Sequence, residues 1–265
     1  MQEFNSLTDA LKNSTLSELL KKTLGQVKNH PQDIRTRELL FKLYCLEGAW
    51  NKALVQLQTL VLMDEERKKQ TELYKNLVFS EVQRLQILTG ERQPVSLKGD
   101  LPAWAIKLHE ANNDHYQGRS EQSAARRDEA FEMAPESAGS SGTLGDFSWI
   151  ADSDSRLGPI CEFICAGGYR WLPFSAIHKL SVLKPEKLLD LLWLPATITT
   201  EGEQFHGYIP ARYPLNKDDS QEIKLGAKTE WLQLSDSLSV GCGRKVIITD
   251  TSELSIMEID DVVFE

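Results

Sequence analysis

Apolar residues recur at intervals of three and four through the first half of the chain, which is the spacing of one buried helix face. The first such stretch opens with Thr15 and Glu18, a possible capping box, and ends before Pro31. Short glycine or proline turns separate the stretches that follow, so neighbouring helices must be antiparallel. We expect helices over residues 15–30, 34–46, 50–64, 64–89, 101–111 and 119–134.

Two of these stretches share an internal pattern. Each follows a glycine, at Gly48 or Gly118, and each carries a small residue five positions later, at Ala53 or Ser123. This arrangement resembles the second half of a tetratricopeptide repeat, in which a small residue lets paired helices approach closely. A plain helical bundle is the alternative. A repeat-like superhelix would present a concave groove of the kind that binds a peptide or helix.

The second half of the chain carries short apolar runs between turn residues, which is typical of strands. We expect strands over residues 169–174, 177–183, 191–200, 204–209, 229–234, 245–249 and about 254–264. Residues 160–166 read as a short helix, with Gly158 as N-cap and Pro159 at the first helical position. A small curved antiparallel sheet or a partly open barrel fits this pattern best.

A glycine- and serine-rich segment, residues 136–142, separates the two patterns, and we interpret it as a linker or mobile loop. The predicted fold class is therefore α+β with two domains. Residues 1–138 would form an all-α tetratricopeptide-like superhelix. Residues 139–265 would form a small, mostly antiparallel β domain with short helices.

Acidic residues are concentrated in the second part. Residues 1–142 hold 19 Lys and Arg against 20 Asp and Glu, and residues 143–265 hold 11 against 19, so the net charges are −1 and −8. Such a surface repels phosphate backbones, so we expect no nucleic-acid partner and favour a basic protein surface.

The compartment follows from three further features. No apolar run approaches the ~18–20 residues needed to span a bilayer, and Met1 to Ser6 lack the features of a signal peptide. The four cysteines include no Cys-x-x-Cys pair. We therefore expect a cytoplasmic protein with free thiols and no membrane partner.

Candidate chemistry is sparse. Asp152, Asp154 and Arg156 alternate in a polar loop, where the aspartates could bind a cation, but the glycine and distal glutamate of a calcium loop are absent. We favour hydrogen bonds to loop N–H groups and a pairing with Arg156. Cys161 and Cys165 lack further metal ligands nearby and favour buried thiols. We expect no metal, no cofactor and no catalytic residue.

A Trp-Leu-Pro element occurs twice, at Trp171 to Pro173 and at Trp193 to Pro195. Proline cannot donate to an internal ladder, so these segments should lie at sheet edges or strand ends. The tryptophans either line an exposed apolar surface or fill the core of the β part, and we favour the core.

Five ordered blocks carry a family resemblance. Residues 149–159 read Trp-Ile-Ala-Asp-Ser-Asp-Ser-Arg-Leu-Gly-Pro. The later blocks are Tyr169-Arg170-Trp171-Leu172-Pro173-Phe174, Asp190-Leu191-Leu192-Trp193-Leu194-Pro195-Ala196, Ile209-Pro210-Ala211-Arg212-Tyr213-Pro214 and Lys228-Thr229-Glu230-Trp231. Together with the region from His30 to Ala53, they resemble the ImpE family, also called TagJ or SciE, of accessory proteins in bacterial type VI secretion.

The resemblance implies a tetratricopeptide-like domain joined to an α+β domain. It also implies a non-enzymatic role: binding the small subunit of the contractile sheath through that subunit's N-terminal helix, and association with the AAA+ ATPase that disassembles contracted sheaths. The alternative is an enzyme with an interdomain site around Asp152, Asp154 and Arg156. The motif residues, structural or partner-binding, are Trp149, Asp152, Asp154, Arg156, Gly158, Pro159, Tyr169, Trp171, Pro173, Trp193, Pro195, Arg212, Tyr213, Lys228, Glu230 and Trp231.

Overall fold

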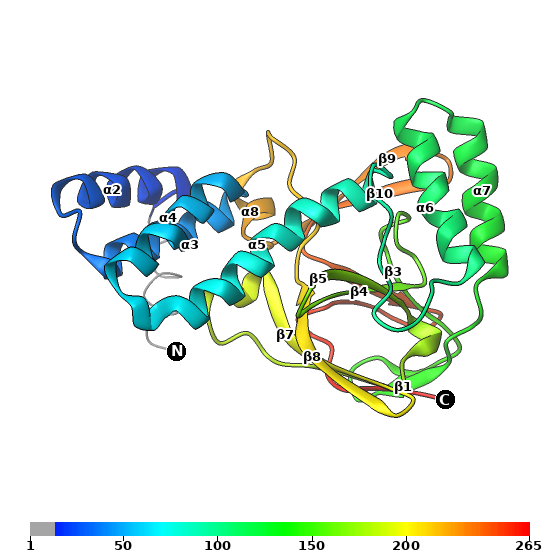
Figure 1. Ribbon diagram of the computed structural model, residues 1–265. Helices are drawn as coiled ribbons and strands as arrows, with labels where there is room; N and C mark the ends of the chain where they lie inside the picture. Colours follow the sequence, from blue (N-terminus) through cyan, green and yellow to red (C-terminus); the bar gives the residue numbers. More distant parts are fainter. Residues whose placement is uncertain (1–13) are drawn as a thin grey trace.

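The computed structural model of the chain describes residues 14–265, so the expectation for Met1 to Ser6 lies outside the described residues. Helices come first and antiparallel strands follow (Figure 1). The predicted capping box is present: the Glu18 N–H donates to Thr15 Oγ1 (3.2 Å) and the Thr15 N–H donates to the Glu18 carboxylate (2.8 Å). The main helices are α2 (Leu16–Asn29), α3 (Ile34–Leu46), α4 (Trp50–Met63), α5 (Lys68–Leu88), α6 (Ala103–Tyr116) and α7 (Ser120–Met133).

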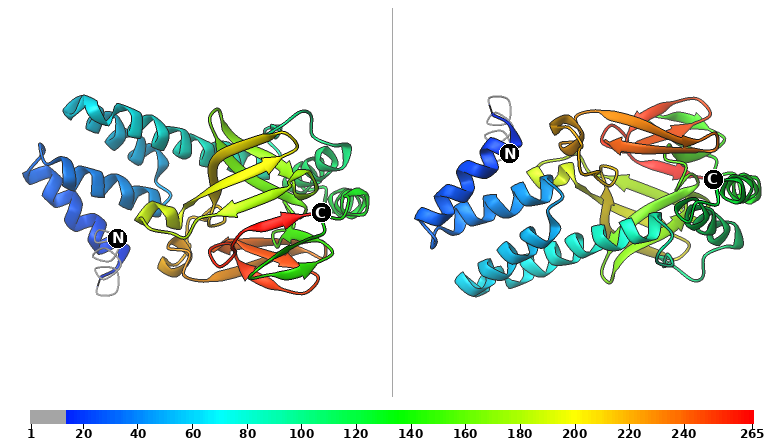
Figure 2. Two further views of the ribbon diagram at one scale, coloured as in Figure 1. Left: turned by 90° about the horizontal axis from the view of Figure 1, so that it is seen from below. Right: turned by 90° about the horizontal axis from the view of Figure 1, so that it is seen from above.

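Two helical hairpins form at the predicted glycine turns. Gly48 and Gly118 have φ values of 68° and 76°, a conformation that glycine adopts without a steric penalty. Each glycine reverses the chain, so α3 packs on α4 and α6 packs on α7. The short turn η1 (Glu65–Arg67) then leads into the long α5. The hairpins lie at opposite ends of the molecule with α5 between them, rather than stacked on one another (Figures 1 and 2).

The second part is an antiparallel sheet domain that does not close into a barrel. Its largest sheet has the strand order β2-β1-β13-β6-β7-β8-β4-β5. The strands of this sheet are β1 (Gly139–Ser141), β2 (Gly145–Phe147), β4 (Ile160–Cys165), β5 (Gly168–Pro173), β6 (Lys179–Val182), β7 (Trp193–Thr200), β8 (Glu203–Pro210) and β13 (Val262–Phe264). The predicted hairpin across residues 201–203 is confirmed as β7 paired with β8.

Smaller elements complete this part. One sheet of three strands has the order β12-β11-β3, and a separate ribbon pairs β10 with β9. The remaining strands and short helices are β3 (Ile150–Asp152), β9 (Thr229–Ser235), β10 (Leu238–Gly243), β11 (Val246–Thr249), β12 (Glu253–Ser255), η2 (Phe174–Ala176), η3 (Leu188–Leu191) and α8 (Gln221–Lys224).

Apolar side chains form two cores. The first lies between the helices and the large sheet, and it joins Leu43, Leu77 and Leu108 to Trp171 and Trp193. The second lies within the β part and includes side chains from the large sheet and from β11. The helical part therefore buries its apolar face against the sheet, with α5 packed on β5. Among residues 14–265, no helix is long and apolar enough to cross a bilayer.

The predicted short helix at residues 160–166 is wrong, because these residues form strand β4. This strand pairs with β5 on one side and β8 on the other, and all but its last residue are buried. A strand buried on both faces shows no apolar–polar alternation, so its run of apolar residues resembles a helix segment. Gly158 and Pro159 therefore lead into a strand and do not cap a helix.

The predicted linker is also wrong at its centre. Gly139–Ser141 is strand β1, which pairs with β2 on one edge and β13 on the other. The Asp260 carboxylate accepts hydrogen bonds from Ser141 Oγ (2.5 Å) and Thr143 Oγ1 (3.1 Å), which hold the turn after β1. Small residues suit this position because a Cβ at Gly139 would lie 2.5 Å from the Val263 carbonyl oxygen.

Candidate functional site: a buried ionic network beside an open groove

The motif loop between β3 and β4 is held by the Asp154 carboxylate. It accepts hydrogen bonds from the Arg156 N–H (2.9 Å) and the Gly241 N–H (3.0 Å). It also pairs with the Arg156 guanidinium, at 2.9 Å from Nε and 2.6 Å from Nη2. Asp154 is fully buried, and Arg156 nearly so. The expected bonds to loop N–H groups and the expected pairing with Arg156 are both present.

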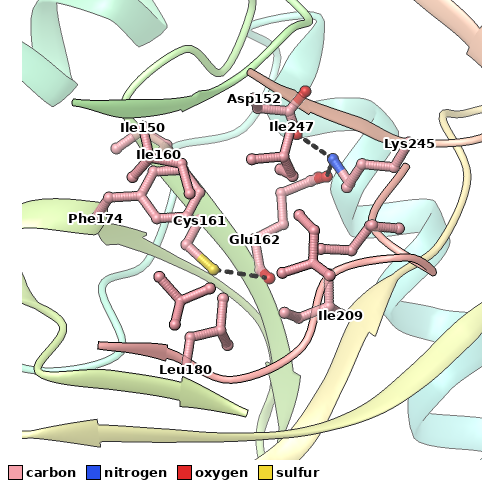
Figure 3. Close-up of a pocket in the computed structure, with 13 residues that line it drawn as sticks. Ile150, Asp152, Ile160, Cys161, Glu162, Phe174, Leu180, Ile209, Lys245 and Ile247 are labelled. Carbon is pink, nitrogen blue, oxygen red and sulfur yellow. Dashed lines mark hydrogen bonds and ion pairs between the residues drawn. The ribbon is translucent and has the colours of Figure 1, made fainter. Parts of the chain in front are cut away.

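Asp152, at the end of β3, joins the loop to a second charge cluster. One carboxylate oxygen accepts from Tyr213 Oη (2.8 Å) and from the Asp154 N–H (3.0 Å). The other oxygen pairs with the Lys245 ammonium (Figure 3). Lys245 directly precedes β11 and is 1% exposed, so this ion pair is cut off from solvent.

Glu162 on β4 joins that cluster to the helical part. Its carboxylate lies 2.6 Å from Arg84 Nε and 2.8 Å from Arg84 Nη2, a bidentate pair with α5. Lys245 Nζ lies 2.6 Å from the same Glu162 carboxylate, and Tyr169 Oη donates a hydrogen bond to it (2.5 Å). Burial alone would raise the pKa of Glu162, but the charges of Arg84 and Lys245 outweigh it and hold that pKa well below its usual range.

Trp171 and Trp193, the tryptophans of the two Trp-Leu-Pro elements, pack around this network and belong to the core between the helices and the large sheet. Trp171 is fully buried, and its Nε1–H donates to Tyr169 Oη (2.8 Å). Trp193 is 1% exposed, and its Nε1–H donates to Glu81 on α5 (2.9 Å). These rings therefore carry the contact between α5 and the sheet, and they do not line an exposed surface.

The prolines of the two Trp-Leu-Pro elements avoid the ladder in different ways. Pro173 is the last residue of β5, which is an edge strand. Pro195 lies inside β7, a central strand, but at the point where β6 has ended. The Leu183 N–H donates to the Pro195 carbonyl oxygen (2.9 Å). Because proline has no N–H, only the second ladder bond, from position 195 back to the Leu183 carbonyl oxygen, is missing.

Arg212 ties a third segment to the helices. Its buried guanidinium donates to the carbonyl oxygens of Leu46 (2.8 Å) and Cys45 (2.9 Å) at the end of α3, and to the carbonyl of Lys224 at the end of α8. A cation is favourable at helix C-termini, where carbonyl groups lack helical partners. Burial lowers the pKa of Arg212 to about 10, which leaves the side chain charged near neutral pH.

The network consists of Asp152, Asp154, Arg156, Glu162 and Lys245, together with Arg84 and Glu81 on α5, and these side chains are buried against one another. The cavity next to Asp152, Glu162 and Lys245 holds about 10 Å³ (Figure 3), and a single water molecule needs roughly 10–15 Å³. Its carboxylates are already saturated by cations and hydrogen-bond donors. Within residues 14–265, no three or more His, Cys, Asp or Glu side chains gather as a metal site would require.

An open groove lies beside the same loop and is lined in part by its residues. This motif groove has a volume of about 420 Å³, and Trp149, one of the residues that line it, is 38% exposed. Gly158 is one of its lining residues and has φ +48°, and a Cβ there would meet the Phe131 ring at 2.6 Å. The residues that line it are Phe131, Ala134, Pro135, Glu136, Ser137, Trp149, Ile150, Ala151, Asp152, Ser153, Ser155, Gly158, Pro159 and Ile248.

The last motif block lies away from the ion pairs. Lys228 and Glu230 form an exposed ion pair (2.7 Å) at the start of β9. Trp231 is 39% exposed, and its ring contacts the Tyr213 ring with centroids 5.7 Å apart. Tyr213 in turn donates to Asp152, so this surface tryptophan is one side chain removed from the network.

Four residues of the network lie outside the motif blocks identified from the sequence: Arg84, Glu81, Glu162 and Lys245. Glu162 does leave one signal, because it is a lone charge within the apolar run Ile-Cys-Glu-Phe-Ile-Cys. A charge at such a position must be paired when the strand is buried. The sequence does not show which cation supplies the partner.

Comparisons with known proteins cover nearly the whole chain. A family model described as ImpE protein matches residues 145–263. A Pseudomonas aeruginosa protein named type VI secretion system accessory component TagJ is 33% identical over 259 residues, which cover 97% of this chain and 90% of that protein. The crystal structure of Vibrio parahaemolyticus protein VPA1032 superposes with a TM-score of 0.89 at 23% identity, over 97% of each chain. That structural likeness shows the fold.

Proposed function

This chain belongs to the ImpE family, and from that membership we propose that it is a non-enzymatic, cytoplasmic accessory protein of bacterial type VI secretion. In this proposal it binds the small subunit of the contractile sheath, through that subunit's N-terminal helix, and links it to the AAA+ ATPase that recycles the sheath. The name of the Pseudomonas aeruginosa relative supports the accessory role. The saturated carboxylates and the water-sized cavity beside them support a role without catalysis.

The motif groove is the observation that carries the proposal. Its volume of about 420 Å³ falls within the range of roughly 300–1,000 Å³ found for binding pockets. Apolar side chains from α7, β3 and β11 line it, and the exposed Trp149 offers an aromatic anchor of the kind that dominates binding energies. An amphipathic helix could insert apolar residues spaced three and four apart.

The charges of the groove favour a basic flank on the bound helix. Among the described residues that line it, Glu136 is exposed, and Asp152 is buried against Lys245. No Lys or Arg belongs to that set. The excess of acidic residues in positions 143–265 acts in the same direction over a longer range. Association should therefore weaken as salt rises.

A second groove serves as an internal comparison. It has a volume of about 410 Å³ and lies between α5 and the segment around η3, with Leu73, Tyr74, Lys184 and Lys187 in its lining. Basic and acidic side chains alternate there, so it suits an apolar, basic helix less well than the motif groove does. Leu73 is 39% exposed, which makes it a matched control for Trp149.

Calorimetric titration of the full chain with a peptide of the sheath subunit's N-terminal helix tests the proposal. Ordering the free helix costs part of the contact energy, so we expect saturable binding on the order of micromolar. Trp149→Ala should weaken binding about tenfold or more, whereas Leu73→Ala should leave it within about twofold. No binding of the peptide or the intact subunit well above micromolar concentration would overturn the proposed function. The reverse pattern of the two variants would move the site to the second groove.

The link to the ATPase is tested separately. The ATPase should co-purify with the full chain in the presence of the sheath subunit, and Trp149→Ala should reduce the amount recovered. Recovery that is independent of the sheath subunit and of Trp149 would show direct binding through another surface. No recovery in any mixture would remove the ATPase from the proposal.

A further inference from the structure

Two side chains of the helical hairpin formed by α6 and α7 hold the motif loop by its backbone. Arg127 Nε on α7 donates to the Ser155 carbonyl oxygen (3.1 Å), and Asn112 Nδ2 on α6 donates to the Arg156 carbonyl oxygen (3.0 Å). Arg127 Nη2 also donates to Asn112 Oδ1 (2.8 Å), so the two side chains are linked. The carbonyl groups of two consecutive motif residues are thereby attached to the hairpin.

Arg127 is a buried cation whose hydrogen-bond acceptors are neutral. It is 0% exposed, and within residues 14–265 it donates to a backbone carbonyl, a side-chain amide and the Ser123 hydroxyl (3.2 Å). Burial lowers the pKa of Arg127 to about 10, although the charges of Asp154 and Asp128 act in the opposite direction. The side chain therefore stays charged near neutral pH. A buried charge is costly to desolvate, and the guanidinium group provides in return several donors in one rigid plane.

The same helix also lines the motif groove. Phe131 lies one turn after Arg127 on α7, so both side chains project from the same face of the helix. Phe131 lines the groove, and its ring occupies the space beside Gly158 that a Cβ would fill. Ser155, which Arg127 holds, lines the groove as well. One face of α7 therefore supplies a lining residue of the groove and the donor that holds a second part of its lining.

Strand β10 holds the motif loop at other points. The Ser239 N–H donates to Ser155 Oγ (3.1 Å), and the Ser155 N–H donates to the Ser239 carbonyl oxygen (3.0 Å). The Gly241 N–H donates to Asp154 Oδ2 (3.0 Å). None of these bonds involves Arg127. Loss of Arg127 should therefore free the loop from α7 while leaving it attached to β10.

We propose that Arg127 is a positioning residue of the motif groove. By holding the Ser155 carbonyl group, it fixes the motif loop relative to Phe131 on the same helix and so sets the shape of the groove. Arg127 is not among the described residues that line the groove, so it acts through the loop and not by contact with a bound segment. The effect on affinity rests on the proposed function, binding of the sheath subunit's helix in this groove. The effect on the loop does not.

Hydrogen–deuterium exchange of the free, full chain tests the effect on the loop. Residues 156–158 direct their N–H groups to Asp154 within the loop. Arg127→Met removes the donors, and these amides should exchange about tenfold faster than in the wild type, because hydrogen bonds from a charged group are lost. Arg127→Lys keeps the charge, but one ammonium cannot reproduce the planar set of donors, so we expect about a threefold increase. Amides of β10 should be unchanged in both variants.

Arg37→Met is the matched control. Arg37 on α3 is half-buried and, like Arg127, donates to a side-chain amide and a backbone carbonyl, those of Gln56 (3.0 Å) and Pro31 (3.0 Å). It lies outside the described lining of the motif groove. This variant loses hydrogen bonds of the same kind, and it should leave exchange at residues 156–158 unchanged.

Calorimetric titration with a peptide of the sheath subunit's N-terminal helix tests the effect on affinity. The variants are compared at a temperature at which circular dichroism shows each to be fully folded, so that a lower global stability alone does not change the affinity. Arg127→Met should weaken binding about tenfold and Arg127→Lys about threefold, because the freed loop must be ordered on binding. Arg37→Met should stay within about twofold of the wild type.

The two measurements together decide the proposal. Faster loop exchange and weaker binding in the Arg127 variants, with neither change in Arg37→Met, would support it. Unchanged loop exchange, faster exchange with unchanged affinity, or equal changes in Arg37→Met would overturn it. If Arg127→Met does not fold, Arg127→Lys decides by the same criteria. If the wild-type chain does not bind the peptide, the proposed function fails, and exchange at residues 156–158 alone decides whether Arg127 positions the loop.

Discussion

The Glu162 carboxylate forms hydrogen bonds or ion pairs with side chains from three parts of the chain: Arg84 on α5, Tyr169 on β5 and Lys245 just before β11. Removing one partner of a buried pair is costly, because the opposite charge stays buried without compensation. The side chain therefore holds the helical part, the large sheet and the three-stranded sheet together. Its stabilising effect depends on its being ionised.

Glu162→Gln should lower the free energy of unfolding by roughly 3–5 kcal/mol near pH 7, as measured by urea denaturation. The pKa of Glu162 is held below its ordinary value of 4.5, so its contribution is complete above that value and is lost as the pH falls below it. The difference between wild type and variant should therefore shrink at about pH 3.5.

Glu72→Gln is the control, because Glu72 is 59% exposed and pairs with Lys75 (2.9 Å) at the surface. Its effect should stay within about 0.5 kcal/mol at either pH. If Glu162→Gln cost no more than this control, the ionic network would not be what joins the helices to the sheet.

Asp154→Asn and Asp152→Asn should each lower the melting temperature, because Arg156 would lose its buried counter-ion and Lys245 would lose one of its two. Each substitution should cost roughly 3 kcal/mol, measured by thermal denaturation followed by circular dichroism. Unchanged melting of both variants would argue against a structural loop and reopen the catalytic alternative around Asp152, Asp154 and Arg156.

At the scale of elements, the sequence predicts helices better than strands. Helices α2 to α7 each leave a stripe of apolar residues and a glycine, proline or polar turn, and these are local signals. Strand β4 leaves a misleading signal because its two neighbours, β5 and β8, bury both of its faces. Strand β1 leaves none, because glycine and serine are disfavoured in strands and only its partners β2 and β13 hold it there.

In the candidate site, too, contacts between residues near in sequence can be predicted, and contacts between distant residues cannot. The pairing of Asp154 with Arg156 can be predicted because both residues lie in one loop. Glu162 is 78 residues from Arg84, and Lys245 is 93 residues from Asp152, so no spacing rule links them. The motif groove likewise depends on Phe131 and Ile248, which are far from the motif in sequence.

Limited proteolysis checks the corrected role of residues 139–141. A protease of broad specificity should cut first in the exposed loop at Asn216, Lys217 and Asp218, because β1 is hydrogen-bonded on both edges. First cleavage within Gly139–Ser141 would show that β1 opens readily and would restore the interpretation as a linker.

For the whole molecule, the shared first core predicts cooperative folding. A fragment of residues 1–138 would expose the apolar residues that pack on Trp171 and Trp193, and it would leave Arg84 without Glu162. We expect this fragment to aggregate or lack fixed tertiary structure, and the full chain to unfold in one transition. A fragment with native near-ultraviolet circular dichroism would instead establish residues 1–138 as a domain with its own stability.

Hydrogen–deuterium exchange of the full chain, with and without the sheath subunit's N-terminal peptide, tests the central claim most directly. If the helix binds in the motif groove, amides of residues 131–137 and 149–153 should exchange more slowly in the complex. Residues 70–77 and 183–190, which border the second groove, should be unchanged. Protection at the second groove alone, or no protection anywhere at saturating peptide, would contradict the account.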